Sequence, residues 1–456
     1  MANFHIAMYP WFALGHMTAF LHLANELAAR GHRISFLLPK KPQFHLHHQN
    51  LHPQLITFPT VTVPTVDGLP PGAETTSEIP LSSNSLLAAA MDLSRDQVES
   101  FLRSTKPDLV MYDFAHWIPN TTKRLGIKSV CYCTASASAI SIALVPAKKV
   151  PKNRPMTEEE LNEIPDGYPS STIVLRGHEV LSLMFVSLPF GDGITFYERA
   201  TTAMKNCDAM CIRTCRELES KFCDYIGNQY EKPVLLTGPV LSKSAKTSLE
   251  ERWDKWLGGF EPSSVVYCAF GSQIVLEKDQ FEELVLGFEQ TGLPFLVALK
   301  PPNGCTTIEE ALPEGFEERL KGRGVVYGGW VQQTMILSHE SVGCFVSHCG
   351  FGSMWESLMS DKQIVAVPQL DDQILNARLL VEELKVALEV KREENGWFWK
   401  ESLSGAIKSV MDKDSEVGIM VKKNHAKWKE VLTKPGFMSG YIDKFVDDLN
   451  KLVNQN

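Results

Sequence analysis

The chain has 456 residues, more than a single hydrophobic core usually organises, so its length predicts two domains. Hydrophobic residues make up 44% and charged residues 22% of the chain, proportions that exclude a wholly disordered or fibrous protein. The formal net charge of −9 argues against nucleic-acid binding, because an acidic surface repels phosphate backbones, although backbone N–H groups can still build a local anion site.

The first half of the chain has the pattern of repeated strand–helix units. Apolar runs predict strands at residues 4–8, 34–38, 108–111 and 128–133, and an amphipathic helix is predicted from about His16 to Arg30. Strands that are apolar on both faces and alternate with helices predict a parallel sheet covered on both sides. Two Pro-rich stretches without a strong period, at 51–80 and 151–171, are interpreted as insertions.

The second half repeats this pattern after a polar stretch. Strands are predicted at 265–270, 294–299, 325–328, 343–347 and 364–367, with a helix at 279–290 and three amphipathic helices in the tail. We therefore expect an N-terminal domain at 1–240, a linker at 241–255, a second domain at 256–435, and a C-terminal helix at 436–456 that packs back on the first domain. Both domains are predicted to be doubly wound α/β units facing a cleft, in which ligands bind at the carboxyl ends of the strands.

The cysteines and the apolar segments indicate the cellular compartment of the protein. Ten cysteines are scattered through the chain, several inside apolar runs, which favours buried thiols over a disulfide framework. The N-terminus lacks the features of a signal peptide, and the longest weakly polar stretch, 135–147, is too short and too polar to cross a bilayer. These features predict a cytoplasmic protein without integral membrane association. The histidines at 45–48 and Asp412-Lys413-Asp414 are interpreted as surface turns, and no metal site is predicted.

A glycine-containing turn in the second half has the properties of an anion site. Gly350 and Gly352 follow the strand at 343–347 and precede a helix predicted to begin at Ser353. Glycines let the backbone approach a ligand, and the free N–H groups and dipole of a helix N-terminus suit a pyrophosphate. The side chains of His348 and Ser353 can donate further hydrogen bonds.

Other residues near this turn could complete a nucleotide site. Glu356 lies one turn into the helix and could accept hydrogen bonds from vicinal ribose hydroxyls, while Trp330 offers a flat face for a base. Ser272 lies in another tight turn after a strand. A dinucleotide-binding fold is the alternative, because Asp372 lies 20 residues after Gly352. That fingerprint lacks its third glycine here, so an oxidoreductase is disfavoured.

The segment from Trp330 to Gln373 resembles the C-terminal signature box of the plant secondary-product UDP-glycosyltransferases. It has the same length of 44 residues. The matching positions are Trp330, Gln333, Leu337, His339, Gly343, Phe345, His348, Cys349, Gly350, Ser353, Glu356, Pro368, Asp372 and Gln373. The resemblance extends over the whole chain and implies the two-domain GT-B fold of that family.

The resemblance also implies roles for individual residues. Trp330 would stack on uracil, Gln333 and Glu356 would hold the ribose, His348 and Ser353 the pyrophosphate, and Asp372 and Gln373 the hydroxyls of the donor sugar. Thr134 matches a residue that contacts the donor sugar. The full set expected to bind the UDP-sugar is Gly15, Thr134, Ser272, Trp330, Val331, Gln333, His348, Gly350, Gly352, Ser353, Glu356, Asp372 and Gln373.

The box departs from its commonest form at a few positions. Phe351-Gly352 stands where Trp-Asn is usual, and Asp361 stands where Gly is usual. Gly352 lacks the side-chain amide that helps to orient the sugar and phosphate, so the identity of the donor sugar is left open. The sequence of residues 348–356, together with that of residues 9–13, resembles one branch of the family, whose members extend an existing sugar on flavonoid or terpenoid glycosides.

Transfer of a sugar to an alcohol requires a general base, and a positioned histidine has a suitable pKa. His16 follows the first strand at the carboxyl edge of the predicted sheet, and Asp113 follows a later strand at the same edge. A carboxylate on the second ring nitrogen would fix the tautomer. Helix capping is the alternative role for Asp113. The resemblance implies that His16 and Asp113 form the catalytic pair.

Aromatic residues near this pair are candidates for the acceptor site. Trp11, Phe12, Phe114 and Trp117 lie beside His16 or Asp113 in the sequence and would suit an aromatic acceptor. Packing in the core explains these residues equally well.

The predicted function is the inverting, metal-independent transfer of a sugar from a UDP-sugar to a hydroxyl of a small plant glycoside, by a monomer that needs no cofactor. Glycosylation of a bare aglycone is the alternative within the same class. A non-catalytic UDP-sugar binder or a nucleotide-sugar epimerase is the alternative from another class. The donor could be glucose, xylose, galactose or rhamnose.

Overall fold

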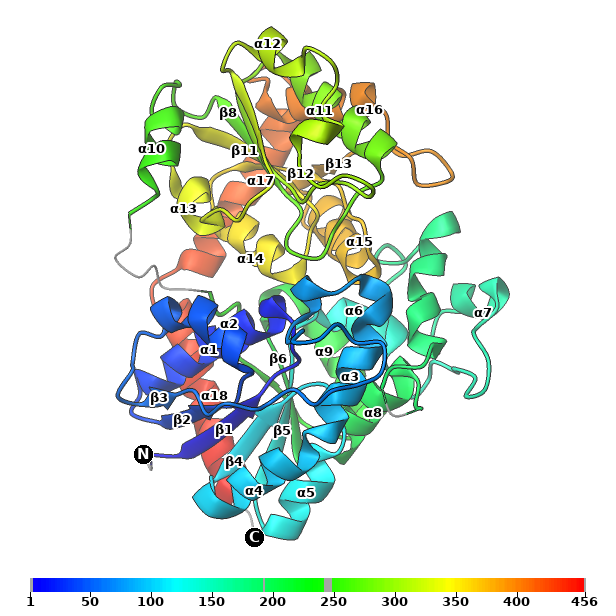
Figure 1. Cartoon of the computed structure of the whole chain (residues 1–456), viewed down its shortest axis with the longest axis vertical. Coiled ribbons are helices and arrows are strands. Elements are labelled where there is room, and N and C mark those ends of the chain that lie inside the picture. The colour runs from blue at the N-terminus through cyan, green and yellow to red at the C-terminus, as the bar shows by residue number, and fades with distance from the viewer. Residues whose placement is uncertain (1–2, 192, 242–247, 455–456) are drawn as a thin grey trace. The chain divides into compact units, whose positions relative to one another are not determined.

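The computed structural model describes residues 3–191, 193–241 and 248–454. It divides into two compact units (Figure 1). Unit 1 contains residues 1–170, 183–245 and 435–456, and unit 2 contains residues 171–182 and 246–434. Each unit therefore contains residues from both halves of the sequence.

Unit 1 is built on a seven-stranded parallel sheet with the order β3-β2-β1-β4-β5-β6-β7. This order, in which the chain winds outward in both directions from β1, is that of a doubly wound α/β fold. The strands are β1 (His5–Tyr9), β2 (Arg33–Phe36), β3 (Ile56–Thr57), β4 (Leu109–Tyr112), β5 (Lys128–Cys133), β6 (Ala209–Ile212) and β7 (Val234–Leu236).

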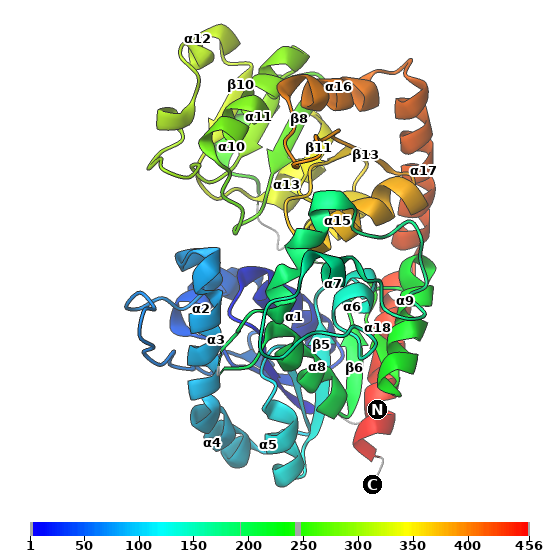
Figure 2. The same cartoon turned by 90° about the vertical axis from the view of Figure 1, so that its right-hand side faces the viewer.

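Helices accompany the strands of unit 1, and the last helix of the chain joins them. They are α1 (Leu14–Ala28), α2 (Lys40–Leu46), α3 (Asn84–Leu93), α4 (Arg95–Thr105), α5 (Ile118–Leu125), α6 (Ala137–Ala143), α7 (Glu158–Asn162), α8 (Phe196–Asn206), α9 (Arg216–Tyr230) and α18 (Phe437–Asn454). α18, drawn in red in Figure 2, packs against α1 and β7. The Tyr441 hydroxyl accepts the backbone N–H of Arg216 at 2.8 Å.

Unit 2 contains a six-stranded parallel sheet with the order β10-β9-β8-β11-β12-β13. The strands are β8 (Val265–Ala269), β9 (Phe295–Ala298), β10 (Gly324–Tyr327), β11 (Val342–Ser347), β12 (Gln363–Ala366) and β13 (Ala387–Glu389). The helices are α10 (Glu251–Leu257), α11 (Lys278–Thr291), α12 (Phe316–Leu320), α13 (Gln333–Ser338), α14 (Phe351–Met359), α15 (Asp371–Arg378), α16 (Lys400–Met411) and α17 (Glu416–Thr433).

Both faces of the second sheet are buried. Along β8, Val266 and Cys268 face a core shared with α11 and α16, whereas Val265 and Tyr267 face a second core shared with α10 and α13. The alternation follows from the two-residue period of a strand, and it explains why these strands are apolar without interruption. The prediction of two doubly wound parallel α/β units is confirmed.

The structure adds elements that the sequence analysis did not predict. β3 lies inside the stretch interpreted as an insertion at 51–80, and β6, β7 and β13 are further short strands. α10 begins inside the stretch 241–255, whose residues 242–247 lie outside the described part of the chain. All ten cysteines are free thiols. Among the helices described, none is both long and apolar enough to cross a membrane.

Candidate functional site

The first group of candidate residues lies at the carboxyl edge of the sheet in unit 1. β1 and β4 are neighbours, with Tyr9 opposite Tyr112, so the residues that follow the two strands lie side by side. His16, near the start of α1, approaches Asp113 there, and 2.7 Å separates His16 Nδ1 from Asp113 Oδ2. Asp113 is buried, whereas 28% of the His16 side chain is exposed and available to a ligand.

The Asp113 carboxylate is fixed by the backbone around it. Its Oδ1 accepts the N–H groups of Trp11 and Phe114, both at 2.6 Å, which leaves Oδ2 to face the imidazole. An acceptor carboxylate on Nδ1 assigns the ring proton to that nitrogen and leaves Nε2 of His16 to accept a proton from a substrate. Asp113 does not cap the following helix α5, whose N-cap residue is Trp117; its hydrogen bonds go to the backbone of Trp11 and Phe114 and to His16.

Thr134 and Gly15 complete this edge. The Thr134 hydroxyl, which follows β5, lies 3.0 Å from His16 Nδ1, so it contacts the imidazole directly. The resemblance implied only a contact with the donor sugar. Gly15 has open space where a Cβ would lie, so the backbone beside His16 is accessible.

A cluster of aromatic rings begins beside His16. The Phe114 ring lies 5.5 Å from the imidazole, edge to face, and 5.7 Å from the Trp11 ring. Phe190 and Phe196 lie 6.0 Å and 5.2 Å from Phe114. These last two rings were missed in the sequence because they lie more than 70 residues beyond Asp113 and belong to no motif.

Three of the four predicted acceptor residues lie in the core. Phe12 has no exposed surface and packs edge-on against Tyr9, 5.8 Å between ring centroids. Trp117 is 3% exposed and stacks under the guanidinium of Arg95 at 5.4 Å. The packing alternative therefore describes Phe12 and Trp117, and also Trp11, which is 4% exposed and stacks on Phe12. Phe114 is the predicted acceptor residue that lies beside His16.

A buried ion pair supports the loop that carries Asp113 and Phe114. Arg199, in α8, is fully buried and pairs with the buried Asp92, donating from Nη1 to Oδ1 at 2.9 Å. The same Nη1 donates to the Phe114 carbonyl at 3.1 Å, and Nε donates to the Phe190 carbonyl at 2.8 Å. One side chain thus holds two segments of the aromatic cluster.

The second group of candidate residues lies in unit 2, where β11 leads into α14. The structure begins this helix at Phe351, with Gly350 as its N-cap, two residues before the predicted start at Ser353. Because a helix leaves its first N–H groups without helical partners, those of residues 351–353 form the donor end of α14. The first intrahelical bond, from Met354 N to the Gly350 carbonyl, is 2.8 Å long.

His348 is buried against two glycines. A Cβ at Gly350 would lie 2.5 Å from His348 Nε2, and one at Gly271 would lie 3.0 Å away, so the ring occupies the space that side chains would take. Burial lowers the pKa of His348 to about 4. The imidazole is therefore neutral near pH 7, and it can serve a diphosphate as a hydrogen-bond donor but not as a cation.

Three residues expected to hold the ribose and the phosphates meet in one network. Gln333 Nε2 donates to Glu356 Oε2 at 2.6 Å and to Ser353 Oγ at 3.1 Å. Tyr267 reaches Gln333 from the sheet at 3.4 Å. Trp330 is 69% exposed, which suits a surface on which a base stacks, whereas its neighbour Val331 is buried.

The residues expected to contact the sugar lie at the start of α15. Asp372 is half-buried, and Gln373 is buried, with its Oε1 accepting the N–H groups of Gln369 at 3.0 Å and Leu370 at 3.2 Å. Ser272 is exposed in the turn after β8. Gly352 faces open space where the usual asparagine side chain would lie.

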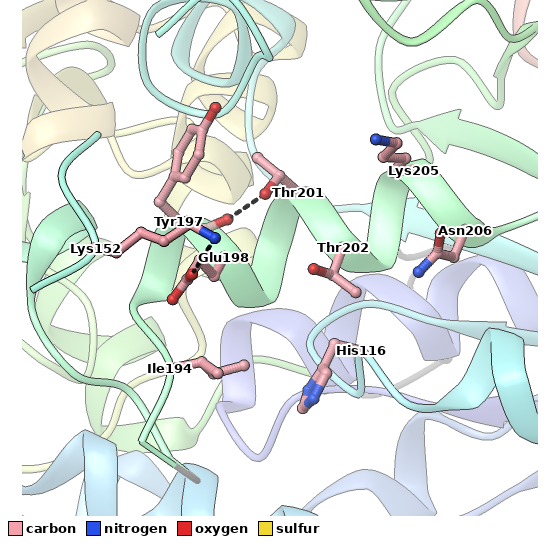
Figure 3. A pocket seen from close by; sticks show the side chains of 9 residues that line it. All are labelled: His116, Lys152, Ile194, Tyr197, Glu198, Thr201, Thr202, Lys205 and Asn206. Atoms are coloured by element: carbon pink, nitrogen blue, oxygen red, sulfur yellow. Dashed lines mark hydrogen bonds and ion pairs between the residues drawn. The ribbon is translucent and has the colours of Figure 1, made fainter. Parts of the chain in front are cut away.

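The pocket in Figure 3 is separate from these residues. Its volume is about 400 Å³, and it opens between the loop after β4 and the outer face of α8 in unit 1. It is lined by His116, Lys152, Ile194, Tyr197, Glu198, Thr201, Thr202, Lys205 and Asn206. None of these nine belongs to the candidate site. No cluster of His, Cys, Asp or Glu suited to a metal occurs in the described parts of the chain.

The burial of His348 leads to a prediction on pH dependence. The affinity for UDP-glucose, whose diphosphate has no group that titrates near neutral pH, is expected to stay constant from pH 5.5 to 8, because His348 remains neutral throughout. The unfolded chain takes up the proton below about pH 6.5 and the folded protein only near pH 4. This group therefore lowers the free energy of unfolding as pH falls through that window, by roughly 1.4 kcal/mol for each unit of pKa difference.

Calorimetric titrations at several pH values measure the affinity directly. A step in affinity between pH 6 and 7 that disappears in His348→Gln would contradict the neutral imidazole.

Comparisons with known proteins identify the family of this chain. A family model described as "UDP-glucoronosyl and UDP-glucosyl transferase" matches residues 224–425. UDP-glycosyltransferase 79B6 of Arabidopsis thaliana is 59% identical over 453 residues, which cover 99% of this chain and 98% of that protein. The anthocyanidin 3-O-glucoside 2'''-O-xylosyltransferase of the same plant is 58% identical over 457 residues, with the same coverage of both chains.

Solved structures share the fold at lower identity. Arabidopsis thaliana UGT89C1 in complex with UDP-L-rhamnose matches with a TM-score of 0.77 at 22% identity, covering 98% of this chain and 100% of that one. Glycyrrhiza uralensis UGT73P12 in complex with glycyrrhetinic acid 3-O-monoglucuronide matches with a TM-score of 0.78 at 19% identity, covering 99% and 96%. The fold is that of the GT-B glycosyltransferases.

The chain belongs to the plant UDP-glycosyltransferases, enzymes that transfer a sugar from a UDP-sugar. Within that family it falls in the 79B group. The recognition of the signature box and the prediction of this enzyme class are confirmed.

Proposed function

We propose that the protein transfers a sugar from a UDP-sugar to a sugar hydroxyl of a flavonoid or terpenoid glycoside, with inversion at the anomeric carbon and without a metal ion. The observation that carries the proposal is the His16–Asp113 pair. A 2.7 Å hydrogen bond joins an accessible imidazole to a buried carboxylate that two backbone N–H groups hold in place.

The proposed reaction is a single displacement. His16 Nε2 takes the proton of the acceptor hydroxyl while that oxygen forms a bond to the anomeric carbon of the donor sugar. The bond from this carbon to the diphosphate breaks on the opposite face, and UDP leaves with the electron pair, so the configuration inverts. Asp113 stabilises the imidazolium that forms at His16, and it keeps the ring in the reactive tautomer.

The charge that develops on the leaving diphosphate needs stabilisation. The N–H groups at the start of α14 and the neutral His348 are hydrogen-bond donors of the kind that stabilise such a charge in a fixed geometry. With these donors, a bound cation is not required for the displacement.

The class of acceptor is proposed from two further observations. The curated relative at 58% identity is named for transferring xylose to an anthocyanidin 3-O-glucoside. Phe114, which lies beside His16, forms an aromatic cluster with the half-buried Phe190 and Phe196, backed by the buried Trp11. Such a cluster would suit a planar aglycone. A bare aglycone hydroxyl is the alternative acceptor.

The test is a screen of donors against acceptors with EDTA present, read by mass spectrometry. UDP-glucose, UDP-xylose, UDP-galactose and UDP-rhamnose are each combined with flavonoid and terpenoid aglycones and with their monoglucosides. We expect a pentose, hexose or deoxyhexose mass to be added to a glucoside and not to the matching aglycone. Addition only to aglycones would favour the alternative acceptor. The absence of any product, despite UDP binding, would contradict the proposal.

A further inference from the structure

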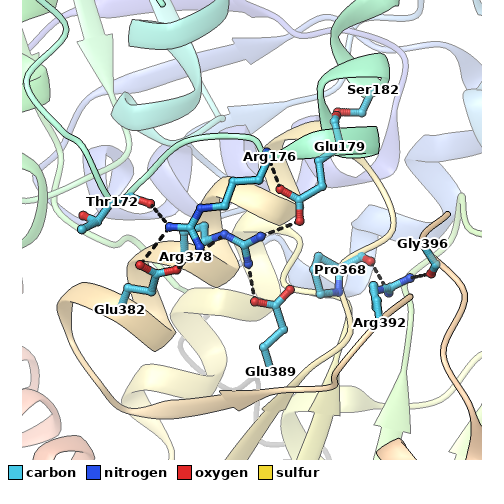
Figure 4. A network of polar contacts seen from close by, with 10 residues as sticks. All are labelled: Thr172, Arg176, Glu179, Ser182, Pro368, Arg378, Glu382, Glu389, Arg392 and Gly396. Atoms are coloured by element: carbon cyan, nitrogen blue, oxygen red, sulfur yellow. Dashed lines mark hydrogen bonds and ion pairs between the residues drawn. The ribbon is translucent and has the colours of Figure 1, made fainter. Parts of the chain in front are cut away.

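The segment of residues 171–182 belongs to unit 2, although the residues on either side of it in the chain belong to unit 1. Its contacts are drawn in Figure 4. The segment leads into a short helix, η4 (Gly177–Ser187), and Glu179 lies in the first turn of this helix. We call residues 171–182 the inserted segment.

Glu179 makes the central contact of the inserted segment. Its Oε1 accepts a hydrogen bond from Arg378 Nη2 at 2.5 Å, and its Oε2 accepts the backbone N–H of Arg176 at 2.8 Å. Arg378 also pairs with Glu389 at the end of β13. The side chains of Glu179, Arg378 and Glu389 are 10%, 8% and 19% exposed, so the three charges are largely removed from water and depend on one another.

Two further contacts fasten the segment nearby. Arg176 pairs with Glu382 at 2.8 Å, and the Thr172 hydroxyl donates to Glu383 at 3.0 Å. Both acceptors lie in the π-helical turn η6 (Leu379–Glu383), which continues α15. The inserted segment is therefore bound to the carboxyl end of α15 and to the turn that follows it.

A second arginine, the half-buried Arg392, holds the loop that leads into α15. Arg392 Nη2 donates to the Pro368 carbonyl at 2.5 Å, and Nη1 donates to the Gly396 carbonyl at 2.7 Å. Pro368 stands just before the loop that leads into α15, whose first turn carries Asp372 and Gln373. The helix is thus held at its start by Arg392 and at its end, through Arg378, by Glu179 and Glu389.

We propose that Glu179 is a positioning residue for the donor sugar: through Arg378 it holds α15 in the place where Asp372 and Gln373 can meet the sugar hydroxyls. This inference rests on the proposed sugar contacts of those two residues. Arg378 lies six residues after Asp372, about 9 Å along the helix axis, so a shift at one end of this short helix is transmitted to the other.

The expected effect is specific to the sugar. The residues expected to hold uracil, ribose and pyrophosphate lie outside this network, at Trp330, in α13 and in α14. α15 also contacts the expected phosphate turn at Asn376, whose Nδ2 donates to the Cys349 carbonyl at 2.9 Å. A displaced α15 would therefore weaken the contacts to the sugar more than those to the nucleotide. A misplacement of about 1 Å by a distant substitution can cost as much as 10²-fold in rate, so a tenfold loss of discrimination is reasonable.

The test compares the binding of UDP with that of UDP-glucose and UDP-xylose by calorimetry, in the full-length protein. For Glu179→Gln we expect the Kd of UDP to stay within twofold of wild type. The ratio of the Kd of the tighter-binding UDP-sugar to that of UDP is expected to rise about tenfold. Glu179→Asp, which keeps the charge, is expected to recover part of the loss. Glu160→Gln makes the same chemical change in the exposed Arg154–Glu160 pair of unit 1, outside this network, and serves as the matched control with an unchanged ratio.

Other outcomes are distinguishable. An equal weakening of UDP and UDP-sugar, or an unchanged ratio in a folded Glu179→Gln protein, would overturn the inference. If that variant does not fold, Arg378→Lys is measured in its place with the same two expectations. Asp372→Ala tests the premise separately, because an unchanged ratio in that variant would remove the proposed sugar contact itself, whatever Glu179 does.

Discussion

Replacing His16 with alanine is expected to lower kcat by about 10³-fold, within the range of 10² to 10⁴ typical for the loss of a general base. The acceptor hydroxyl would then have to lose its proton to water, because the imidazole that Asp113 orients is gone. The Kd of UDP is expected to stay within twofold, since the nucleotide contacts are predicted on residues of unit 2.

The measurement is initial rates together with UDP titrations on purified variants. Asp113→Asn keeps the shape of the pair but favours the wrong tautomer, so it should also lose most of its kcat. His47→Ala, which removes an exposed histidine of the same unit, is the matched control and should keep wild-type activity. Wild-type turnover in His16→Ala would exclude the proposed mechanism.

Replacing Arg199 with methionine is expected to destabilise the protein by about 3–5 kcal/mol, the usual cost of removing one partner of a buried ion pair. Arg199 is fully buried, and Asp92 is 7% exposed, so the remaining carboxylate would be left in a site with little access to water. The carbonyls of Phe114 and Phe190 would also lose the hydrogen bonds that Arg199 donates.

Urea denaturation followed by fluorescence and circular dichroism measures this loss. The double variant Arg199→Met with Asp92→Asn removes the uncompensated charge, and it should recover part of the stability, as expected for two groups that interact directly. Arg154→Met is the matched control, because Arg154 pairs with Glu160 at an exposed site, where an ion pair contributes little. Equal stability of Arg199→Met and wild type would contradict a structural role for the pair.

The fold was predictable because most of its strands are buried on both faces. The strand predicted at 128–133 matches β5 residue for residue, and the tail resolves into the three helices expected. The strands that were missed are short: β3 has two residues, and β7 and β13 have three each. Runs of that length carry too little periodicity to separate a strand from a loop. The early start of α14 was missed because its N-cap is a glycine, which also occurs in ordinary turns.

The parts of the candidate site that could be predicted are those formed by residues close together in the sequence or at the ends of predicted strands. Most of the residues predicted to bind the nucleotide lie within one 44-residue stretch, where spacing along the chain can be read directly. His16 and Asp113 each follow a predicted strand at one edge of the sheet. Phe196, Arg199 and Glu179 act on residues far away in the sequence. Such contacts arise only when the chain folds, and no local pattern of residues marks them.

The position of α18 has a consequence for the synthesis of the protein. α18 covers α1 and β7 of unit 1, burying Ile442, Phe445, Val446 and Leu449, yet it leaves the ribosome after all of unit 2. At 5–20 residues per second, translating residues 246–434 takes roughly 10–40 s. During that interval unit 1 lacks its last helix, and the apolar surface that α18 will cover stays open to chaperones and to other nascent chains.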